Sequence, residues 1–560
     1  MNYARQQDRR FRMFAAFVAA MAVLTLSGAA IPAQAQTYKV LYENPGAPGI
    51  SNPNDEAIAQ GRDGNLYTTD VLGGVSDDGT LFKFTPSGVA TIVNTINYYP
   101  AGGVTLGTDG NFYGTNQNGG TFLCGESDGG QVYKVTPAGV QTILHSFMGN
   151  GDGCNPYSAP IQAADGVFYG TTTVNSYGGN NAESTVYTVT SGGVFTAIHT
   201  FTGPDGQNVY APLVQGTDGN FYGDTIGGGT NNLGVIFKMT PAGAVTVLHS
   251  FGTPPDGKLA YYGLIQASDG NFYGTTQYGG TAANGIVFKI TPGGTYSVLY
   301  NLNGHSDGAN PSSSLVQASD GKLYGVANLN GSTQFGTIYS ITTSGTYSVV
   351  YNFDNATGAF PASPLRQNTN GILYGTTYNG GDLSTCNGGG CGVLYSLNIG
   401  KVPFAGLVST SDKEGAKIGI LGQGFKTTSV VAFGGVQATS IKLGSATFIT
   451  ATVPVGALTG SVTVTTGSTR LSSNAKFRVT PTFPSFSPTS GPVGTPVVLT
   501  GTGLTQTTKV TFGGVKATNV TVNSDSQVTA YVPTGAKTGK IVITTKGGSA
   551  KSKTDFTVTM

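Results

Sequence analysis

The chain has 560 residues, of which 87 are glycine and 10% are charged, and its formal net charge is +1. A single hydrophobic core stops growing at about 250–300 residues, so this length excludes one simple core and predicts several domains or a repeat array. Lysines and arginines are scattered, which excludes a basic stripe for phosphate groups, and we expect no nucleic-acid partner. Short β-branched and aromatic runs between glycine-rich turns predict an all-β protein.

The first 35 residues have the pattern of a secretory signal peptide. Arginines between positions 5 and 12 precede an apolar run over 13–26, and Ala33-Gln34-Ala35 offers small residues for cleavage near Ala35. The alternative, a signal anchor, is disfavoured because the apolar run is shorter than the ~20 residues that span a bilayer. We therefore expect the mature chain to lack a membrane span and to be secreted or held at the cell surface.

A phrase of the type Asp-Gly-Asn-Phe-Tyr-Gly recurs through the first 400 residues. It is clearest at Asp109–Gly114 and returns in varied form at positions 63, 165, 218, 269, 320 and 370. The successive spacings are 46, 56, 53, 51, 51 and 50 residues, a period typical of propeller blades or another repeat array. An Asp-Gly pair between two β-runs predicts a two-residue hairpin turn with positive φ at both positions, so strands a and b of each unit form a hairpin.

Each unit continues with two further strands, which predicts a four-stranded meander. Val132–Val135 and Thr142–Phe147 show the third and fourth strands, c and d, of one copy. The mature chain begins with Tyr38–Tyr42, which matches a fourth strand, and the last unit stops after its third strand, Val393–Leu397. This split predicts a seven-bladed β-propeller over residues 36–400 that the N-terminal strand closes, leaving no free sheet edge. The alternative, an open solenoid, does not account for the split.

The repeat resembles the GloVer tandem repeats of exported, often anchored bacterial proteins. The resemblance covers about residues 37–400 and rests on the phrase Phe272–Thr276, followed by Gly279-Gly280 and then Gly285–Phe288. It implies a repeat architecture and no particular reaction. The double glycines also resemble kelch repeats, but the chain lacks the tryptophan that such blades usually carry.

From about residue 401 the period changes to 79 residues. Gly422–Phe425 corresponds to Gly501–Leu504, and Val453-Pro454 corresponds to Val532-Pro533. Alternating apolar and polar residues predict two Ig-like sandwiches, over 401–480 and 481–560. Both copies resemble IPT/TIG domains, and the resemblance implies spacer or adhesion modules.

Four cysteines in an exported chain predict disulfides, and three pairings are possible. Cys386 and Cys391 share one glycine-rich loop, whereas Cys124 and Cys154 lie in loops on either side of the third and fourth strands of one unit. Those loops emerge on the same face of a meander, so we predict the local pairs Cys124–Cys154 and Cys386–Cys391. A zinc site, the alternative, lacks a histidine or paired carboxylate at ligand spacing.

Three histidines occupy equivalent places in successive fourth strands, at His145, His199 and His249. Equivalent places in different blades do not converge on one substrate unless they line the axis, so repeated packing or hydrogen bonding at the sheet edge is predicted. The sequence contains no nucleophile elbow, no His-Glu-x-x-His and no phosphate loop, and we predict no catalytic residue.

A second series of Asp-Gly pairs lies in the long loops between strand d of one unit and strand a of the next, and tyrosines follow the first three by five residues. Carboxylates and tyrosines around a funnel are suited to a sugar or a Ca²⁺ ion. The alternative is structural: the Asp-Gly pairs turn the loops, and the tyrosines pack between blades. The predicted ligand-binding residues are Asp152, Asp205, Asp256, Asp307, Tyr157, Tyr210 and Tyr261.

These patterns together predict an exported, monomeric, non-catalytic binding or adhesion protein. Its recognition surface is the loop face of the propeller, its partner an extracellular glycan or surface protein, and its Ig-like pair a stalk. No cofactor is expected unless the loops bind Ca²⁺. One alternative is a carbohydrate-active enzyme, which needs two carboxylates roughly 5–10 Å apart in the funnel. The other is a purely structural envelope protein.

Overall fold

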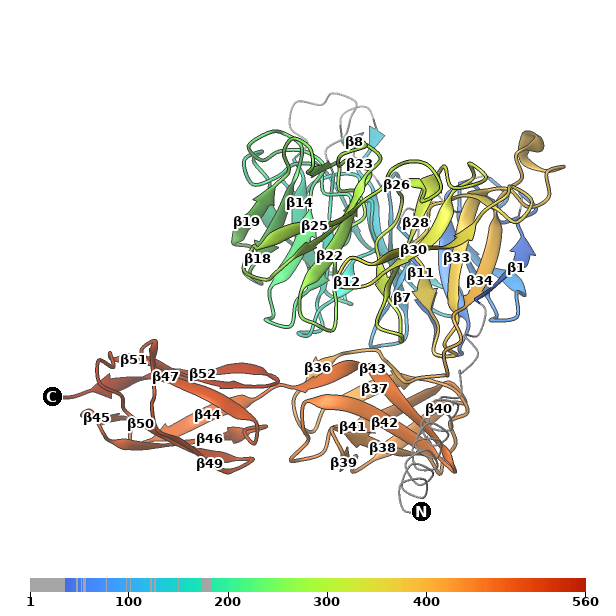
Figure 1. Cartoon of the computed structure of the whole chain (residues 1–560). Coiled ribbons are helices and arrows are strands. Elements are labelled where there is room, and N and C mark those ends of the chain that lie inside the picture. The colour runs from blue at the N-terminus through green and yellow to red at the C-terminus, as the bar shows by residue number, and fades with distance from the viewer. Residues whose placement is uncertain are drawn as a thin grey trace, which may run out of the picture.

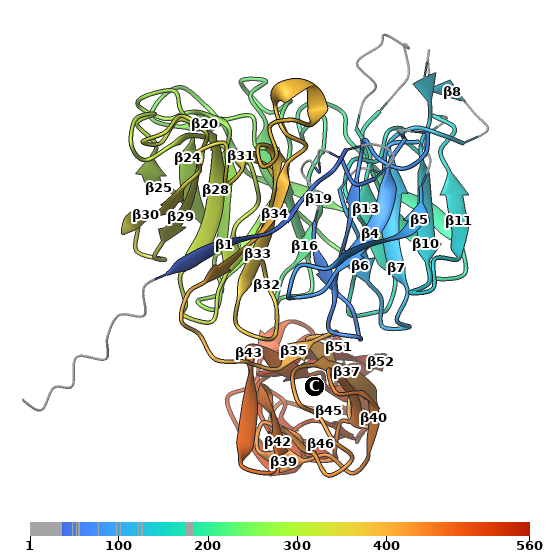
Figure 2. The same cartoon turned by 90° about the vertical axis from the view of Figure 1, so that its right-hand side faces the viewer.

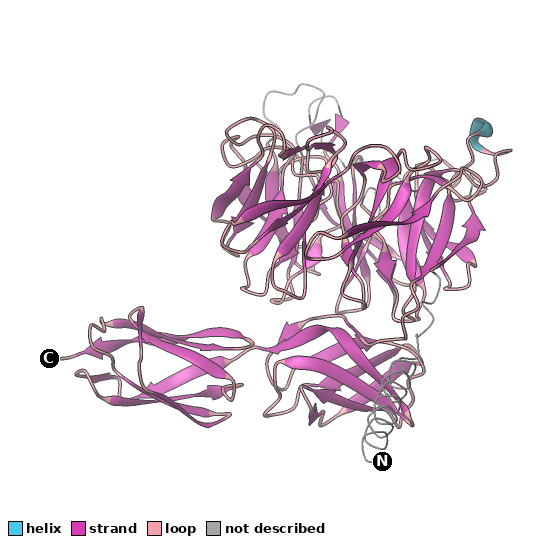
Figure 3. Ribbon diagram, in the orientation of Figure 1, coloured by secondary structure: helices cyan, strands magenta, loops and turns pink. Residues whose placement is uncertain are grey.

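The computed structural model describes residues 36–560 except 47–48, 52, 54–56, 77, 97, 101, 121–122, 125–126, 150 and 174–182. The described residues form an all-β molecule with one short 3-10 helix, η1 (Cys386–Gly388) (Figures 1 and 3). The predicted signal peptide, residues 1–35, lies outside the described residues. Within the described part, no helix is both long and apolar enough to cross a membrane.

The described residues up to Asn398 form a propeller of seven sheets, which we number as blades 1 to 7. The strands of each blade are given from the inner strand a to the outer strand d. Blade 1 consists of β2 (Ala59–Gln60), β3 (Leu66–Asp70), β4 (Thr80–Phe84) and β5 (Ala90–Thr95), and blade 2 consists of β6 (Thr105–Leu106), β7 (Phe112–Asn116), β10 (Gln131–Val135) and β11 (Gln141–Ser146). Blade 3 consists of β12 (Ile161–Gln162), β13 (Phe168–Thr171), β14 (Thr185–Val189) and β15 (Phe195–Thr200), and blade 4 consists of β16 (Val214–Gln215), β17 (Phe221–Asp224), β18 (Val235–Met239) and β19 (Val245–Ser250).

Blades 5 to 7 follow the same order, and short extra strands lie in some loops. Blade 5 consists of β21 (Ile265–Gln266), β22 (Phe272–Thr276), β24 (Ile286–Ile290) and β25 (Tyr296–Asn301). Blade 6 consists of β27 (Val316–Gln317), β28 (Leu323–Leu329), β29 (Thr337–Ile341) and β30 (Tyr347–Asn352). Blade 7 consists of β32 (Arg366–Gln367), β33 (Leu373–Asn379), β34 (Val393–Asn398) and β1 (Thr37–Glu43). The extra strands are β8 (Leu123–Cys124), β9 (Ser127–Asp128), β20 (Gly257–Lys258), β23 (Tyr278–Gly279), β26 (Ala309–Pro311) and β31 (Ala359–Pro361).

The N-terminal strand closes the ring as the outer strand of blade 7. Strand β1 pairs antiparallel with β34, with Tyr38 opposite Leu397. Its Tyr38 ring stacks on Tyr351 of blade 6 at 3.8 Å, much as Tyr347 stacks on Tyr300 one blade earlier at 4.0 Å. The predicted closed propeller is therefore the observed fold.

The cores of the propeller lie between the blades, because each sheet presents apolar residues to both neighbours. Seven hydrophobic clusters of buried residues each join one pair of adjacent blades. One of them packs Leu66 and Phe84 of blade 1 against Tyr374 and Leu394 of blade 7, at the point of closure. Burial of this kind stabilises by roughly 25 cal/mol per Å² of apolar surface, so the closing interface adds to the stability as the other six do.

The a–b hairpins differ from the predicted two-residue turn. In blade 2 the Gly110 N–H donates to Gly107 O, the Gly107 N–H donates to Asn111 O, and only Gly110 of the Asp-Gly pair takes a positive φ, 95°. This is a three-residue loop, a type I turn followed by a glycine bulge. Asp109 stays in ordinary backbone geometry because its carboxylate accepts hydrogen bonds from the Asn111 N–H (3.0 Å) and the Tyr113 hydroxyl (2.8 Å).

Two sandwiches with the same strand order follow the propeller. The first consists of β35 (Gly406–Leu407), β37 (Lys417–Leu421), β41 (Phe448–Thr452) and β40 (Ile441–Ser445) facing β36 (Ser411–Asp412), β43 (Thr469–Val479), β42 (Gly460–Thr466), β38 (Val430–Phe433) and β39 (Val436–Gln437). The second consists of β44 (Thr482–Ser487), β46 (Pro496–Thr502), β50 (Gln527–Tyr531) and β49 (Val520–Ser524) facing β45 (Ser490–Gly491), β52 (Gly548–Val558), β51 (Gly539–Thr545), β47 (Thr507–Phe512) and β48 (Val515–Lys516).

The first sandwich lies against the propeller face that carries the a–b hairpins, and the second continues end to end from the first (Figures 1 and 2). The hydroxyls of Ser445 and Thr447 donate to the carbonyl of Arg62, at 2.8 and 2.9 Å. The Arg62 guanidinium lies over the Phe448 ring, 4.4 Å from its centroid. The first sandwich is thus fixed to the propeller by specific contacts, whereas a simple stalk needs none.

Candidate functional site

A cavity of about 1510 Å³ runs along the axis of the propeller. The inner strands supply its wall, including Val214, Ile265 and Val316. One end is lined by tyrosines from the long d–a loops, and the other by residues of the first sandwich, among them Asn474 and Arg478. The cavity is large enough for a ligand of several rings, since pockets for drug-sized molecules measure roughly 300–1,000 Å³.

Tyrosines gather at the loop end of the cavity. The rings of Tyr157 and Tyr210 meet edge to face with centroids 4.8 Å apart, and Tyr210 meets Tyr261 in the same way at 5.4 Å. Tyr262 lines the cavity beside them. Burial, and then the neighbouring Tyr157 and Tyr261, raise the pKa of Tyr210. We call Tyr157, Tyr210, Tyr261 and Tyr262 the tyrosine cluster.

The tyrosine cluster arises from the repeat. Tyr157, Tyr210 and Tyr261 each stand four residues before the first residue of the inner strand in their blade. Because inner strands surround the axis, equivalent positions in adjacent blades lie side by side at the cavity. Among the described residues, blades 6 and 7 have Ser312 and Ala362 at this position, so the tyrosines lie on the side of the cavity end that blades 3 to 5 form.

The aspartates predicted to share this rim lie elsewhere. Asp152, Asp205 and Asp256 accept hydrogen bonds from His145, His199 and His249 at 2.9–3.0 Å, and Asp307 accepts one from the Tyr300 hydroxyl at 3.0 Å. All four donors belong to strand d, the outer strand, and none of the four aspartates is among the described residues that line the cavity. The structure therefore separates the two halves of the expected rim, because strand d is the strand farthest from the axis.

These carboxylates tether the d–a loops to the outer strands. Burial alone would raise the pKa of Asp256, but hydrogen bonds from His249 and the Tyr296 hydroxyl outweigh it and hold that pKa below its usual value. The His249 ring stacks on Tyr296 of the next blade at 3.8 Å, and His145 stacks on Phe195 at 3.6 Å. The histidines thus form the predicted repeated edge contacts.

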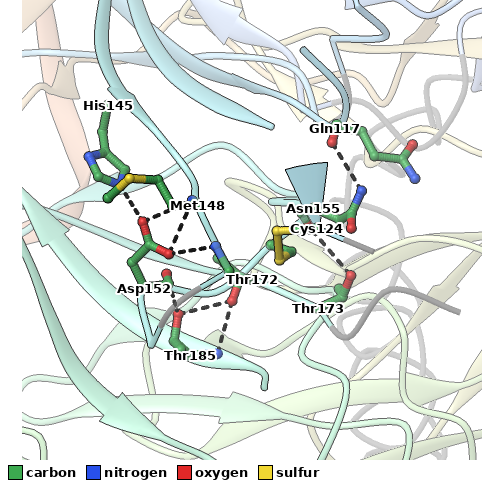
Figure 4. Close-up of a disulfide and its surroundings, with 11 residues drawn as sticks. Gln117, Cys124, His145, Met148, Asp152, Asn155, Thr172, Thr173 and Thr185 are labelled. Atoms are coloured by element: carbon green, nitrogen blue, oxygen red, sulfur yellow. Dashed lines mark hydrogen bonds and ion pairs between the residues drawn. A yellow bond between two sulfur atoms is a disulfide. The ribbon is translucent and has the colours of Figure 1, made fainter. Parts of the chain in front are cut away.

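Both local disulfides are present, Cys124–Cys154 and Cys386–Cys391. The first joins the b–c loop of blade 2 to its d–a loop, close to Asp152 (Figure 4). The second lies beneath the N-terminal segment, where the Asn44 side-chain amide donates to Cys391 O at 3.2 Å. The described residues contain no cluster of three or more histidine, cysteine, aspartate or glutamate side chains that could hold a metal ion.

Arg366 is the one charged residue at the cavity-facing start of an inner strand. It lies deep in the molecule, yet its side chain is exposed because it projects into the cavity. No described residue forms a hydrogen bond or ion pair with its guanidinium, and burial lowers the pKa of Arg366 from its ordinary value. A guanidinium nevertheless stays protonated in proteins, so the cavity contains an unpaired positive charge.

The first sandwich forms the opposite end of the cavity. Arg478 of β43 donates a hydrogen bond to the carbonyl of Thr217, in the a–b turn of blade 4. Thr369, in the corresponding turn of blade 7, accepts a hydrogen bond from the Gln423 amide at 3.0 Å and donates one to Gly422 O at 3.3 Å. Contacts on two sides of the ring hold this sandwich across the axis.

The family model for the Gloeobacter/Verrucomicrobia repeat matches residues 29–176 and 161–388. The chain belongs to this repeat family. The model for the IPT/TIG domain matches residues 481–558, the second sandwich. No curated protein sequence matches the chain.

Similar solved structures are remote. Virginiamycin B lyase from Staphylococcus aureus is 11% identical over 65% of this chain and 98% of its own, with a TM-score of 0.42. A fungal alcohol oxidase is 12% identical over 94% of this chain and 100% of its own, with a TM-score of 0.46. A gluconolactonase from Xanthomonas campestris is 11% identical over 66% of this chain and 93% of its own, with a TM-score of 0.36.

Within this Gloeobacter/Verrucomicrobia repeat, a belt of glutamines joins the blades around the axis. Six of the seven inner strands end in glutamine, and each of these glutamines accepts a hydrogen bond at 2.8–3.0 Å from a backbone N–H in the a–b turn of the preceding blade. The glutamines are Gln60, Gln162, Gln215, Gln266, Gln317 and Gln367. Sequence reasoning missed them, although each stands three residues before the aspartate or asparagine of the repeat phrase.

Replacing Gln60 tests the belt at the point of ring closure. Its amide oxygen accepts from the buried Thr369 N–H at 3.0 Å, and its amide nitrogen donates to the Thr369 hydroxyl at 2.8 Å. Gln60→Leu, which copies Leu106 of blade 2, is expected to lower the free energy of unfolding by about 2 kcal/mol because a buried N–H loses its partner. Urea unfolding measures this, with the exposed Gln437→Leu as the control; equal midpoints for the two variants would contradict the prediction.

Proposed function

We propose that this protein is an exported, non-catalytic glycan-binding protein whose ligand enters the axial cavity past the tyrosine cluster. The observation that carries the proposal is the tyrosine cluster itself, a continuous aromatic wall lining a cavity of about 1510 Å³. Tyrosine offers a flat apolar face and a hydroxyl at its rim, which suits the apolar faces and hydroxyls of a sugar ring. Glutamines 215, 266 and 317 add amide groups to the same cavity.

Export is supported by the chemistry of the chain. Two disulfides are compatible with an oxidising compartment outside the cytoplasm, which is where such bonds persist. We propose that the mature chain is secreted or displayed at the cell surface. In this proposal the first sandwich closes one end of the cavity, and the second acts as a spacer apart from Lys546, which also lines the cavity.

The carbohydrate-active enzyme considered from the sequence is less well supported. A glycosidase of the usual type needs two carboxylates roughly 5–10 Å apart in the site. Among the described residues that line the cavity the one carboxylate is Asp269, and Asn271, Tyr273 and Lys289 already bind it. Asp205 and Asp256, two of the predicted rim aspartates, lie in the d–a loops that follow blades 3 and 4, where each is bound to an outer strand.

The decisive test is glycan-array binding by the mature chain, with and without calcium, compared with the triple variant Tyr157→Ala, Tyr210→Ala and Tyr261→Ala. Each aromatic contact that anchors a ligand contributes about 1–2 kcal/mol, so the triple variant is expected to bind at least about 100-fold more weakly. Tyr531→Ala, an exposed tyrosine of the second sandwich, serves as the control and should bind normally. If the wild-type chain binds no glycan, or the folded triple variant binds as well as the wild type, the proposal fails.

A further inference from the structure

Arg366 departs from the repeat at the position that faces the axis. The residues that begin the inner strands of the other six blades are small or β-branched and carry no charge: Ala59, Thr105, Ile161, Val214, Ile265 and Val316. Blade 7 has an arginine there, followed by the same glutamine as its neighbours. Nothing in the construction of a blade requires this arginine, since six blades form without one.

The environment of Arg366 supplies no partner for its charge. The Arg366 side chain is exposed to the cavity, so its guanidinium is accessible to a ligand there. Arg366 lines the axial cavity and forms no hydrogen bond or ion pair with any described residue. The guanidinium presents five N–H donors in a planar fork, which matches a carboxylate with two parallel hydrogen bonds.

The rest of the cavity lining strengthens the attraction for an anion. The first sandwich contributes Lys476 and Arg478, and the second contributes Lys546. The one carboxylate among the described lining residues, Asp269, is paired with Lys289 at 3.4 Å. Cavities lined by one sign of charge concentrate ligands of the opposite sign.

We infer that the axial cavity binds an acidic saccharide, with its carboxylate on Arg366 and its rings against the tyrosine cluster. The saccharide part of this inference rests on the proposed function. The acidic part rests independently on Arg366, on its departure from the repeat and on the basic lining. The two groups play different roles: the tyrosines recognise sugar rings in general, and Arg366 selects for the charge.

The test compares wild type with Arg366→Val, which copies Val316 of blade 6 and should leave the fold intact. The mature chain is applied to an array of uronate-containing, sulfated and neutral oligosaccharides. Wild type is expected to bind uronate-containing glycans at least tenfold more tightly than neutral ones, and Arg366→Val to lose that preference while its binding of neutral glycans is unchanged. Arg366→Lys should recover part of the preference, and Arg470→Val, an exposed arginine of the first sandwich, should behave as wild type.

A second measurement separates failure of the inference from failure of the proposed function. The melting temperatures of wild type and Arg366→Val are compared in sodium sulfate and in sodium chloride at equal ionic strength. Glycan binding without a preference for acid, or with a preference that survives Arg366→Val, overturns the inference and leaves the proposed function standing. If no glycan binds and sulfate stabilises only the wild type, both fail, and Arg366 forms a site for small inorganic anions alone.

Discussion

Removing residues 36–43, and with them strand β1, is expected to lower the free energy of unfolding of the propeller by more than about 4 kcal/mol, a loss that few single changes approach. The deletion exposes the edge of β34, removes Tyr38 and Val40 from the contacts with blades 6 and 7, and opens the ring. A free sheet edge with apolar neighbours also favours aggregation. Scanning calorimetry should show the propeller transition at least about 5 °C lower, because 1 kcal/mol shifts the midpoint of a domain of about 365 residues by roughly 1.3 °C.

The deletion has an internal control. A synthetic peptide of residues 36–46 added to the shortened chain is expected to restore the transition in a concentration-dependent manner, since binding of the native state stabilises it. Tyr38→Ala, which removes the stacking on Tyr351 but keeps the backbone ladder, should have an intermediate effect. If the shortened chain unfolds like the full one, β1 does not close the ring.

Asp224→Thr is expected to stabilise the propeller by about 3 kcal/mol at pH 7, in the range measured when a buried charged group is replaced by a well-packed one. Asp224 is completely buried at the end of β17, and neither of its carboxyl oxygens meets a hydrogen-bonding partner among the described residues. At the equivalent position Thr115, Thr171 and Thr275 donate to a backbone carbonyl of the next blade, at 3.1–3.3 Å. The substitution restores the residue that the repeat uses.

The gain should depend on pH in a definite direction. Burial raises the pKa of Asp224 well above its ordinary value, and the N–H groups of Asp224 and Gly263, which lie near the carboxyl without meeting hydrogen-bond geometry, oppose this only in part. Below the unfolded-state pKa of about 3.9, Asp224 is protonated in both the folded and the unfolded chain, so its ionisation costs the wild type no stability there. As the pH rises from there through the folded pKa, the unfolded chain releases its proton first and the native state loses stability.

Urea unfolding of wild type and Asp224→Thr at pH 4 and pH 7 tests this directly. The difference between the two proteins should be small at pH 4 and near its full value at pH 7. The reverse substitution Thr275→Asp, one blade further on, should destabilise with the same pH dependence. A difference that is constant with pH would show that packing, and not the carboxyl, accounts for the effect.

The parts of the fold that the sequence predicted depend on short-range chemistry. One turn of the chain contains a glycine with positive φ, an aspartate that binds the N–H two residues later and a tyrosine four residues after that aspartate. The repeat phrase can therefore be recognised from the sequence alone. The phase of the repeat identified the closing strand, because Tyr38–Tyr42 is a fourth strand without a third before it. The cysteine pairs followed from the loops that share a face. The turn type was the exception, because the Asp-Gly pair occurs in two-residue and three-residue hairpins alike.

The candidate site depended on the tertiary structure. Tyr157, Tyr210 and Tyr261 are separated by 51 to 53 residues and meet only because inner strands surround one axis. The aspartates in the same loops bind outer strands instead. They therefore lie farther from the axis than the tyrosines, a difference that the spacing of residues along the chain does not show. The docking of the first sandwich across the axis depends on surfaces that fold separately. The sequence by itself therefore determined the number and order of the blades, through local turns and period, whereas ring closure decided which side chains share a cavity and left Arg366 unpaired within it.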